Sequence, residues 1–401
     1  MSSAIPDGWS KNTIDECCEI LDSQRVPINS EERAKRKGDY PYYGANGVQG
    51  YIDDYIFEGD SILLAEDGGN FDQYADRPIA QWVTGKFWVN NHAHILRAKD
   101  NATDKWIFYS LVHKNILKNI NGGTRAKLNQ SDLKEIEILL SPLPEQKKIA
   151  SILTSVDEVI ENTQKQIDKL QDLKKATMNE LLTKGIGHTE FKDSELGRIP
   201  KSWEVVNFQE LIHSSNQGVN TTTEKVTYSD NGTKACRSNN IQENYFDWSD
   251  EKFVDQDTYA RLSEKVKPQM NDVLYCNIGS NLGASTVVMV SEPFMVTWNV
   301  LRITPNHRVI MPHFLCYSLN SARQKLRDFA TESTMPFISS KALSKFKFRI
   351  PPISEQEKIS IAIDTIYSLI EFQKQKLSQT QSLKKSLMQD LLTGKVRVTV
   401  N

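Results

Sequence analysis

The sequence predicts an α+β protein made of two mixed α/β domains and two long antiparallel coiled-coil helices. The first observation is an internal repeat: the segment that begins at Pro142 returns at Pro352 without a gap, and fifteen of the 45 aligned positions are identical. Unrelated segments of ordinary composition would share roughly 3 positions. The second observation is that strand-like runs between Gly and Asn turns precede each copy. A chain that repeats one domain and one helix can present two similar surfaces, which suits a target with two halves.

Both copies of the repeat have the apolar spacing of a long helix. Apolar residues recur at alternating steps of four and three in 149–163, and a similar stripe begins at Ile359. Prolines precede each segment, and Gly185 and Gly394 follow them, as is typical of helix boundaries. About 38 helical residues at about 1.5 Å per residue give a rod near 57 Å. Each stripe must be covered, and we expect the two helices to cover each other in an antiparallel pair.

A globular region precedes each helix, and both regions open with the pattern Ile-Pro-x-x-Trp, at Ile5–Trp9 and Ile199–Trp203. Strand-like runs follow at 43–53, 59–67 and 85–97 in the first region and at 271–280, 285–292 and 294–305 in the second. A helix is expected near the end of each region, at residues 104–118 and 312–329. The predicted division of the chain is 1–141, 142–184, 185–199, 200–351, 352–394 and 395–401.

Composition is that of an ordinary globular protein of 401 residues, with 25% charged and 39% hydrophobic side chains. No apolar run approaches the length of a membrane helix and no signal peptide is evident, so we expect a cytoplasmic protein without a membrane partner. The five cysteines are odd in number and form no C-x-x-C pair. That pattern argues against a disulfide framework and against a zinc site.

Charge is unevenly distributed along the chain. The formal net charge is −2, but residues 1–141 carry −5 and residues 200–351 carry +2. Near the end of each region lies a basic stretch, Lys105–Gln130 and Arg323–Arg349, and the two stretches recur at the repeat offset. A solvated helix face and a surface for DNA or a partner protein remain open as interpretations.

No catalytic site is evident. The sequence has no phosphate-binding loop and no dinucleotide-binding turn. It also lacks the tetrapeptide Asn/Asp-Pro-Pro-Tyr/Phe that amino-methyltransferases use. His92 and His94 could face a metal from one side of a strand, but without further ligands a structural or DNA-facing role is favoured. The acidic pairs Asp53–Asp54 and Glu66–Asp67 are interpreted as solvated turn residues. We therefore assign no catalytic residue and no metal ligand.

Four duplicated patterns resemble the specificity (S) subunits of type I restriction–modification enzymes over nearly the whole chain. They are the Pro-x-x-Glu-Gln-x-Lys-Ile helix start at Pro142–Ile149 and Pro352–Ile359, the Leu-Leu-Thr helix end, the polar linker Gly185–Pro200, and the Ile-Pro-x-x-Trp opening. Any one of these patterns alone would be a weak signal. The resemblance is specific because the patterns are duplicated, in the same order and at these spacings.

The resemblance implies two target-recognition domains that read the two halves of a bipartite double-stranded DNA sequence, with the two conserved helices setting the spacing. Half-sites one helical turn apart on DNA are about 34 Å apart, which a rod of this length can span. The resemblance also implies two methyltransferase (M) subunits and, in a larger complex, two restriction/translocase (R) subunits. Adenine methylation and DNA cleavage, with S-adenosylmethionine, ATP and Mg²⁺, would then belong to those partners, and this chain itself would be non-catalytic. The negative first domain suggests that the M subunits help to enclose the duplex.

Two other functions remain to be weighed. The chain could be a coiled-coil protein–protein scaffold with no DNA reading, which a salt-dependent DNA affinity of the M-containing complex would argue against. It could also be a nuclease or methyltransferase with an unfamiliar site, which binding of S-adenosylmethionine to the chain alone would support.

Candidate DNA-contacting residues are chosen by type, because Arg, Lys, Asn and Gln read base edges and hydroxyls and cations hold phosphates. In the first domain they are Arg33, Lys35, Arg36, Lys37, Tyr42, Tyr43, Asn46, Asn70, Asn90, Asn91, Thr124, Arg125 and Lys127. In the second domain they are Asn216, Gln217, Arg237, Ser238, Asn239, Asn240, Asn277, Ser280, Asn281, Trp298, Asn299, Ser333 and Thr334.

Candidate residues for a subunit interface come from the repeated helices. They are Glu145, Gln146, Ile149, Ile160, Leu173, Leu181 and Leu182 in the first helix, and Glu355, Gln356, Ile359, Ile370, Leu383, Leu391 and Leu392 in the second.

Overall fold

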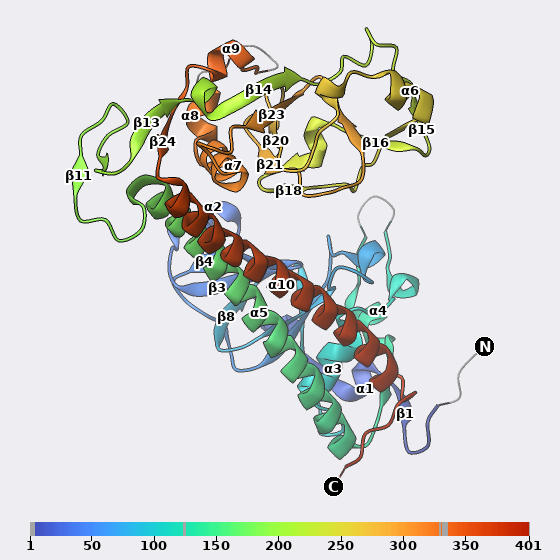
Figure 1. Cartoon of the computed structure of the whole chain (residues 1–401). Coiled ribbons are helices and arrows are strands. Elements are labelled where there is room, and N and C mark those ends of the chain that lie inside the picture. The colour runs from blue at the N-terminus through green and yellow to red at the C-terminus, as the bar shows by residue number, and fades with distance from the viewer. Residues whose placement is uncertain (1–4, 123–125, 329, 331–335, 401) are drawn as a thin grey trace. The chain divides into compact units, whose positions relative to one another are not determined.

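The computed structural model describes residues 5–122, 126–328, 330 and 336–400. The chain forms two compact units, residues 1–165 with 375–401 and residues 166–374. The two long helices, α5 (Leu143–Lys184) and α10 (Ile353–Leu391), each contribute one part to the first unit and one part to the second (Figure 1). In the described part of the chain, no helix is long and apolar enough to cross a membrane.

Two four-stranded sheets form the globular part of the first unit. The first sheet has the order β2 (Cys18–Ile20), β9 (Ala93–Ala98), β6 (Ser61–Ala65), β7 (Ala80–Val83), and all its pairs are antiparallel. The second has the order β4 (Gly47–Ile52), β3 (Tyr40–Gly44), β8 (Lys86–Val89), β5 (Phe57–Glu58), with β3 and β8 parallel. A further pair joins β1 (Ser10–Thr13) to β10 (Glu137–Leu140), and the helices are α1 (Ile14–Cys17), α2 (Ser30–Lys35), α3 (Asp104–Leu111) and α4 (Gln130–Lys134).

The second unit repeats the topology of the antiparallel sheet, whereas the parallel pair of its other sheet lies at an edge and not at the centre. Its antiparallel sheet has the order β14 (Ile212–Gln217), β23 (Val300–Pro305), β20 (Val273–Cys276), β21 (Ser285–Val287). Its other sheet has the order β15 (Tyr228–Ser229), β19 (Phe253–Val254), β16 (Thr233–Cys236), β22 (Phe294–Val296), again with one parallel pair, β16 with β22. The equivalent of the β1–β10 pair is β13 (Glu204–Asn207) with β24 (Lys347–Ile350). The prediction of two mixed α/β domains is confirmed.

Shorter elements complete the second unit. The two-stranded pairs are β11 (Phe191–Lys192) with β12 (Ile199–Pro200) and β17 (Ile241–Gln242) with β18 (Tyr245–Phe246). The helices are α6 (Gln256–Arg261), α7 (Pro312–Ser321), α8 (Arg323–Asp328) and α9 (Ser340–Leu343).

The helices near the ends of the two domains differ from the sequence-based prediction. The first, expected at 104–118, stops at Leu111, because the carbonyl of Val112 accepts a hydrogen bond from the amide of Ile79 at 2.9 Å instead of continuing the helix. The second is divided into α7 and α8 at Ala322. Both helices pack their buried faces on the antiparallel sheet of their own unit.

The two long helices lie antiparallel within each unit. In the first unit, Ile149 and Leu153 of α5 share an apolar core with Leu391 of α10. In the second unit, Leu182 at the end of α5 shares a core with Ile359 and Ile363 at the start of α10. Because the start of each helix shares a core with the end of the other, the predicted antiparallel pair is confirmed. The pattern of buried and exposed residues also repeats along the two helices at the 210-residue offset.

The first joint (Trp9, Glu145, Gly394 and Arg397) connects the first domain to both long helices. The buried carboxylate of Glu145 accepts the indole N–H of Trp9 at 3.0 Å and receives the guanidinium of Arg397 at 2.7 and 2.9 Å. Trp9 opens the domain, Glu145 begins α5, and Arg397 follows α10. One carboxylate therefore holds three chain segments together through charge-assisted hydrogen bonds.

The second joint (Trp203, Glu355, Gly185 and His188) repeats this arrangement in the second unit. The Glu355 carboxylate accepts the Trp203 indole N–H at 3.0 Å, and the His188 ring lies 2.8 Å from its other oxygen. His188 follows α5 here, as Arg397 follows α10 in the first joint. The polar linker and the C-terminal segment thus have the same structural role.

The glutamine after each glutamate fixes the helix near the end of its domain. Gln146 accepts the amide of Thr103, which precedes α3, and donates to the carbonyl of Ser141. Gln356 accepts the amide of Met311, which precedes α7, and donates to the carbonyl of Pro351. The repeated Glu-Gln pair therefore aligns each domain with its helix through buried hydrogen bonds.

We predict that Gly185→Ala destabilises the second joint. Gly185 has φ +69°, and a Cβ there would clash with the Glu355 carboxylate and the Trp203 ring. The matched control is Gly187→Ala, because Gly187 has φ +68° with open space around it. Both substitutions place an alanine in the left-handed backbone region, which lowers the free energy of unfolding by about 1 kcal/mol. Gly185→Ala should lower it by at least about 1 kcal/mol more, because of the clash. Equal free energies of unfolding for the two variants, from urea denaturation, would contradict the prediction.

The first joint is also predicted to be sensitive to acid. Burial acts to raise the pKa of Glu145, but the hydrogen bonds and charge of Arg397, with the Trp9 indole, bring that pKa below its ordinary value. A lowered folded-state pKa stabilises the protein at pH values above the unfolded pKa of about 4.3, and this stabilisation is lost as the pH falls through the folded value.

Glu145→Gln should therefore cost about 1–3 kcal/mol at pH 7. The difference from the parent should begin to shrink below about pH 4.3 and disappear only below the lowered folded-state pKa of Glu145. Urea denaturation between pH 3 and pH 7 measures both effects. Glu161→Gln on the same helix is the control, because Glu161 is exposed and pairs with Lys165 at the surface. A difference that stays constant down to pH 3 would show that the ionised carboxylate does not stabilise the joint.

Candidate nucleic-acid interface

Two loops meet beside the antiparallel sheet of the first domain, and they are called here the first loop pair (residues 66–70 and 126–128). The amide of Leu128 donates to the carbonyl of Glu66 at 2.7 Å, and the amide of Gly68 donates to the carbonyl of Ala126 at 3.4 Å. Asn46 and Asn70 join the same group: the Asn46 amide donates to the Gly68 carbonyl, and Asn70 donates to Asn46. These contacts bring together candidates that are far apart in the sequence.

A polar hollow of about 610 Å³ lies in the same domain. Arg33 lines it, with its guanidinium 4.7 Å from the centre of the Tyr42 ring, and the exposed amide of Asn91 lies at its edge. Gln49, an exposed side chain of β4, also lines the hollow. Gln49 was missed as a candidate because it is the unpaired residue of a bulge in β4, beside the exposed Val48, so no alternating pattern marks it.

Several candidates of the first domain have structural contacts instead of free polar groups. Tyr42 is buried and its hydroxyl lies 3.3 Å from the carbonyl of Ile28. Asn90 is buried and accepts the amide of His92, whereas Arg36 pairs with Asp53 at 2.8 Å. The exposed candidates Lys35, Lys37 and Asn91 remain available to a ligand.

In the second domain, the candidates form two groups. Arg237 pairs with Asp250 at 2.7 Å, and the exposed Asn239 donates to the same carboxylate. Asn240 is buried and donates to the carbonyls of Asp247 and Asp250. The hydrogen bonds of Asn240 therefore fix the loop around Asp250, which in turn binds Arg237 and Asn239.

The other group surrounds the second loop pair (residues 277–281 and 336–338). The amide of Ile338 donates to the carbonyl of Asn277, and the amide of Gly279 donates to the carbonyl of Pro336, each at 2.9 Å. Asn281 donates to the carbonyl of Ser238 at 3.0 Å, which links this group to Arg237. Trp298 has 48% of its surface exposed beside it.

The remaining candidates are placed as follows. Tyr43 packs edge-on against Phe87, Lys127 pairs with Glu66, and Asn216 donates to Ser214. Ser280 is exposed, and Ser238 and Asn299 are half-buried. Thr124, Arg125, Ser333 and Thr334 lie outside the described residues.

Beneath the first loop pair lies the first polar network (Asp22, Arg25, Glu66, His94 and Lys127). Asp22 Oδ2 lies 2.6 Å from His94 Nδ1, and His94 Nε2 lies 2.9 Å from the carbonyl of Leu128. Arg25 and Lys127 approach the two oxygens of Glu66 at 2.7 and 3.3 Å. The interpretation of Glu66 as a solvated turn residue was wrong, because its side chain is 13% exposed and paired with two cations.

The first polar network has three side chains of the kinds that bind cations. Possible ligand atoms of Asp22, Glu66 and His94 lie within 4.8 Å of one another. Each of these side chains already has protein partners, and both ring nitrogens of His94 face oxygen atoms. A metal ion would have to displace the guanidinium of Arg25 and the His94 hydrogen bonds, so the donor set fits an ion-pair network better than a metal centre.

Beneath the second loop pair lies the second polar network (Gln217 and Asn277). The two side-chain amides exchange hydrogen bonds at 3.1 and 3.0 Å. Asn277 also donates to the carbonyl of Ile338, and Gln217 donates to the carbonyl of Trp298. Both residues were selected as DNA contacts, but these hydrogen bonds occupy their side chains inside the domain.

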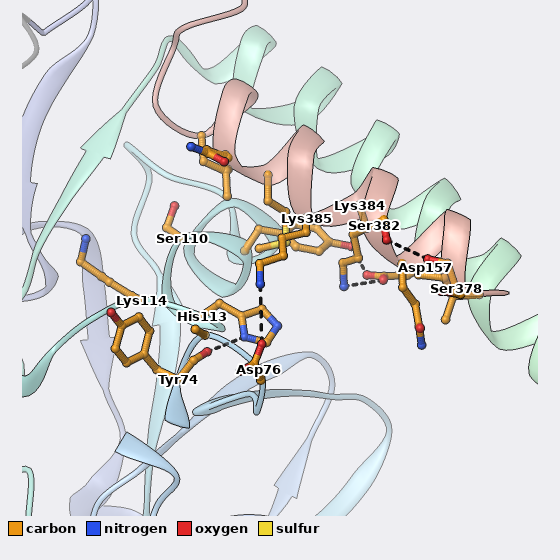
Figure 2. A pocket seen from close by; sticks show the side chains of 17 residues that line it. Tyr74, Asp76, Ser110, His113, Lys114, Asp157, Ser378, Ser382, Lys384 and Lys385 are labelled. Carbon is orange, nitrogen blue, oxygen red and sulfur yellow. Dashed lines mark hydrogen bonds and ion pairs between the residues drawn. The ribbon is translucent and has the colours of Figure 1, made fainter. Parts of the chain in front are cut away.

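Each unit also contains a groove beside its long helices. The first groove, of about 760 Å³, lies between α3 with its following segment and the helices α5 and α10. Figure 2 shows Lys384 paired with Asp157 and Lys385 directed toward Asp76. The second groove, of about 750 Å³, contains Lys174 at the equivalent helical position, with its ammonium 4.8 Å from the centre of the Tyr367 ring.

The interface candidates on the helices divide by exposure. Glu145, Gln146, Ile149, Gln356 and Ile359 are buried within their own unit. Leu173 and Leu383 expose 51% and 52% of their surface, and they occupy equivalent positions of the repeat. The others are buried or half-buried: Ile160, Leu181, Leu182, Glu355, Ile370, Leu391 and Leu392.

Comparison with known proteins identifies the two duplicated regions. A family profile described as "Type I restriction modification DNA specificity domain" matches residues 6–172 and 200–381, which is most of the chain. The chain belongs to this family. It is thus a DNA-recognition subunit of a type I restriction–modification complex, and the scaffold without DNA reading is not favoured. Membership implies a role in recognition and not in catalysis, in a complex that acts on DNA with other subunits.

Relatives and solved structures agree with this assignment. The chain is 28% identical to the type I restriction enzyme MjaVIII specificity subunit of Methanocaldococcus jannaschii, over 98% of this chain and 94% of the relative. It is 30% identical to the putative MjaX specificity subunit of the same organism, over 76% and 71%. The S subunit of a type I system from M. genitalium has the same fold, with a TM-score of 0.66 at 16% identity and coverage of 100% and 98%.

Proposed function

We propose that each domain of this specificity subunit reads one half of a bipartite DNA target, while the paired helices set the half-site spacing. The observation that carries the proposal is that the two domains share one backbone arrangement but expose different side chains on equivalent loops. Asn91 of the first domain corresponds to Trp298 of the second, because His92 and Asn299 make equivalent backbone hydrogen bonds with Glu66 and Asn277. A common scaffold with different exposed groups suits two different short sequences.

The proposal includes two methyltransferase subunits that methylate adenine, and restriction subunits in a larger complex. The first domain carries a net charge of −5 in residues 1–141, which opposes DNA binding by this chain alone. The methyltransferase subunits would supply the missing positive charge around the duplex. S-adenosylmethionine, ATP and Mg²⁺ would bind to those partners.

Exposed apolar residues on the helices support two equivalent docking surfaces. In the first unit, Val159 and Leu383 are 42% and 52% exposed. They lie within one helical turn of Asp157 and Lys384, whose side chains are ion-paired at 2.5 Å. Exposed apolar groups on paired helices are typical of surfaces that another protein covers.

The second unit has the same pair at the repeat offset. Leu369 and Leu173 are 46% and 51% exposed, and they flank the contact between Lys174 and Tyr367. Leu369 corresponds to Val159, and Leu173 corresponds to Leu383. Each unit thus has one such docking surface, and two surfaces per chain support a stoichiometry of two methyltransferase subunits per chain.

The DNA-reading proposal predicts that substitutions in one domain change only one half of the target. The full chain would be co-purified with its methyltransferase subunit, and the methylated sequence would be found by single-molecule sequencing of the host genome. Gln49→Ala with Asn91→Ala should relax the first half, and Arg237→Ala with Asn239→Ala the second. Each lost base contact should weaken discrimination by about tenfold.

The control for this experiment is Asn162→Ala on the exposed face of α5, which should leave both halves unchanged. A bipartite motif with a fixed gap is the expected result for the parent. A stable complex that methylates no defined sequence would contradict the proposal, and a substitution that alters both halves equally would contradict the division of labour.

The docking proposal predicts that Leu173→Lys and Leu383→Lys each remove one methyltransferase subunit from the complex. A lysine at a buried apolar contact is desolvated without a partner, which should weaken that contact at least about tenfold. Native mass spectrometry would give the stoichiometry, which should fall from two subunits to one in either variant. Met270→Lys is the control, because Met270 is 49% exposed in the turn that precedes β20 and belongs to neither long helix. Retention of two methyltransferase subunits by the double variant would refute this docking surface.

A further inference from the structure

The two loop pairs are held by the same backbone hydrogen bonds. Glu66 donates its amide to the carbonyl of His92, as Asn277 donates to Asn299. Leu128 donates to the carbonyl of Glu66, as Ile338 donates to Asn277. These bonds make Glu66 equivalent to Asn277 and Leu128 equivalent to Ile338. The registers of the central strands make His94 equivalent to Leu301. The β2–β9 pairing continues past Ile20 through the hydrogen bond from the Leu21 amide to the Ile95 carbonyl, which makes Asp22 equivalent to Gln217.

The side chains at these equivalent positions differ, but they bind the same carbonyl. In the first domain, the carbonyl of Leu128 lies 2.9 Å from His94 Nε2. In the second domain, the equivalent carbonyl of Ile338 accepts the amide of Asn277 at 3.3 Å, and Leu301 supplies no donor. The two domains therefore meet one requirement, a donor for this loop carbonyl, from different strands and with different chemistry.

The loops in question carry residues that would face DNA. The first loop pair contains Gly68 and Asn70, and Asn91 immediately precedes His92. The second loop pair contains Ser280 and Asn281, and Trp298 immediately precedes Asn299. A displacement of either loop pair would therefore move several of the proposed contacts of one half-site together.

We propose that the first and second polar networks position the DNA-reading loops of their own domains and so set the accuracy with which each half-site is read. This inference rests on the proposed function of the two domains. The residues of the networks act through the loops, and they are positioning residues that need not touch the DNA. A buried carbonyl without a donor is costly, so loss of the donor should favour an open loop pair.

The chemistry of the first polar network is ionic. Both ring nitrogens of His94 face oxygen acceptors, so the ring can donate to both only as the imidazolium. The Asp22 carboxylate beside His94 Nδ1 also accepts the amide of Ile95 at 3.0 Å. Burial acts to raise the pKa of Asp22, but the hydrogen bond and charge of His94, with Ile95 and Arg25, bring that pKa below its ordinary value. The second polar network performs the same task with two neutral amides.

The test uses the full chain in complex with its methyltransferase subunit. Binding is measured to duplexes in which the first half, the second half or neither half of the target carries a single-base change. His94→Leu places at this position the residue that the second domain has, and it removes the donor to Leu128. It should reduce discrimination at the first half by about tenfold or more and leave the second half unchanged. Asn277→Leu should reduce discrimination at the second half and leave the first half unchanged.

Three matched variants separate positioning from general destabilisation. His94→Gln replaces the imidazole donor with a side-chain amide donor and should recover part of the discrimination that His94→Leu loses. Tyr109→Phe and Tyr317→Phe each remove a half-buried hydroxyl that bonds to the long helices in the same two domains, and they should leave discrimination unchanged. Hydrogen exchange should speed up in residues 66–70 and 126–128 of His94→Leu while β6 and β9 stay protected.

The outcomes are distinguishable. If the parent complex discriminates both halves and His94→Leu and Asn277→Leu do so equally well, the positioning proposal is overturned and the proposed function stands. If the parent discriminates neither half, the proposed function fails first. If His94→Leu does not fold, the Asn277→Leu variant and the partial rescue by His94→Gln decide the question.

Discussion

The structure depends on a carboxylate that binds a tryptophan at the start of each long helix. Glu145 and Glu355 are the points where the opening of a domain, the start of one helix and the segment after the other helix meet. The tryptophan supplies one donor, and the remaining acceptor capacity is filled from the segment beyond the other helix. Because an ionised carboxylate is stable in this surrounding only when fully hydrogen-bonded, the joint fixes three segments at once. The adjacent glutamine extends the same control to α3 and α7.

With both domains fixed to the helices in the same way, their sequences could diverge elsewhere without loss of the fold. The polar networks illustrate how far this divergence has gone. The loop hydrogen bonds and the register of the two central strands of the antiparallel sheet are the same in both domains. Yet one network contains two carboxylates and three basic side chains, and the other contains two amides. Backbone geometry is therefore the shared property of the domains, and the side chains that satisfy it are specific to each one.

The larger features of the fold could be predicted from the sequence because they repeat. An offset of 210 residues linked the helices, and the apolar spacing gave their antiparallel pairing. The loop residues were harder to place, because an Asn in a turn can serve the backbone or a ligand equally well. Asn240 and Asn277 serve the protein interior, whereas Asn91 and Asn239 are exposed. The role of Glu66 was missed because its partner Arg25 lies 41 residues earlier, on a segment that carries no recognisable pattern.

The joints also determine which parts of the chain can be exchanged during evolution. In the second domain, the residues that form the joint lie before and after the recognition region, at Gly185–Trp203 and at Glu355. A recombination event that replaced the segment between Trp203 and Glu355 would leave every polar contact of the joint intact. The duplicated joint thus makes each domain a replaceable cassette. On the proposed function, a new sequence between the joint residues would change one half of the DNA target and leave the paired helices as they are.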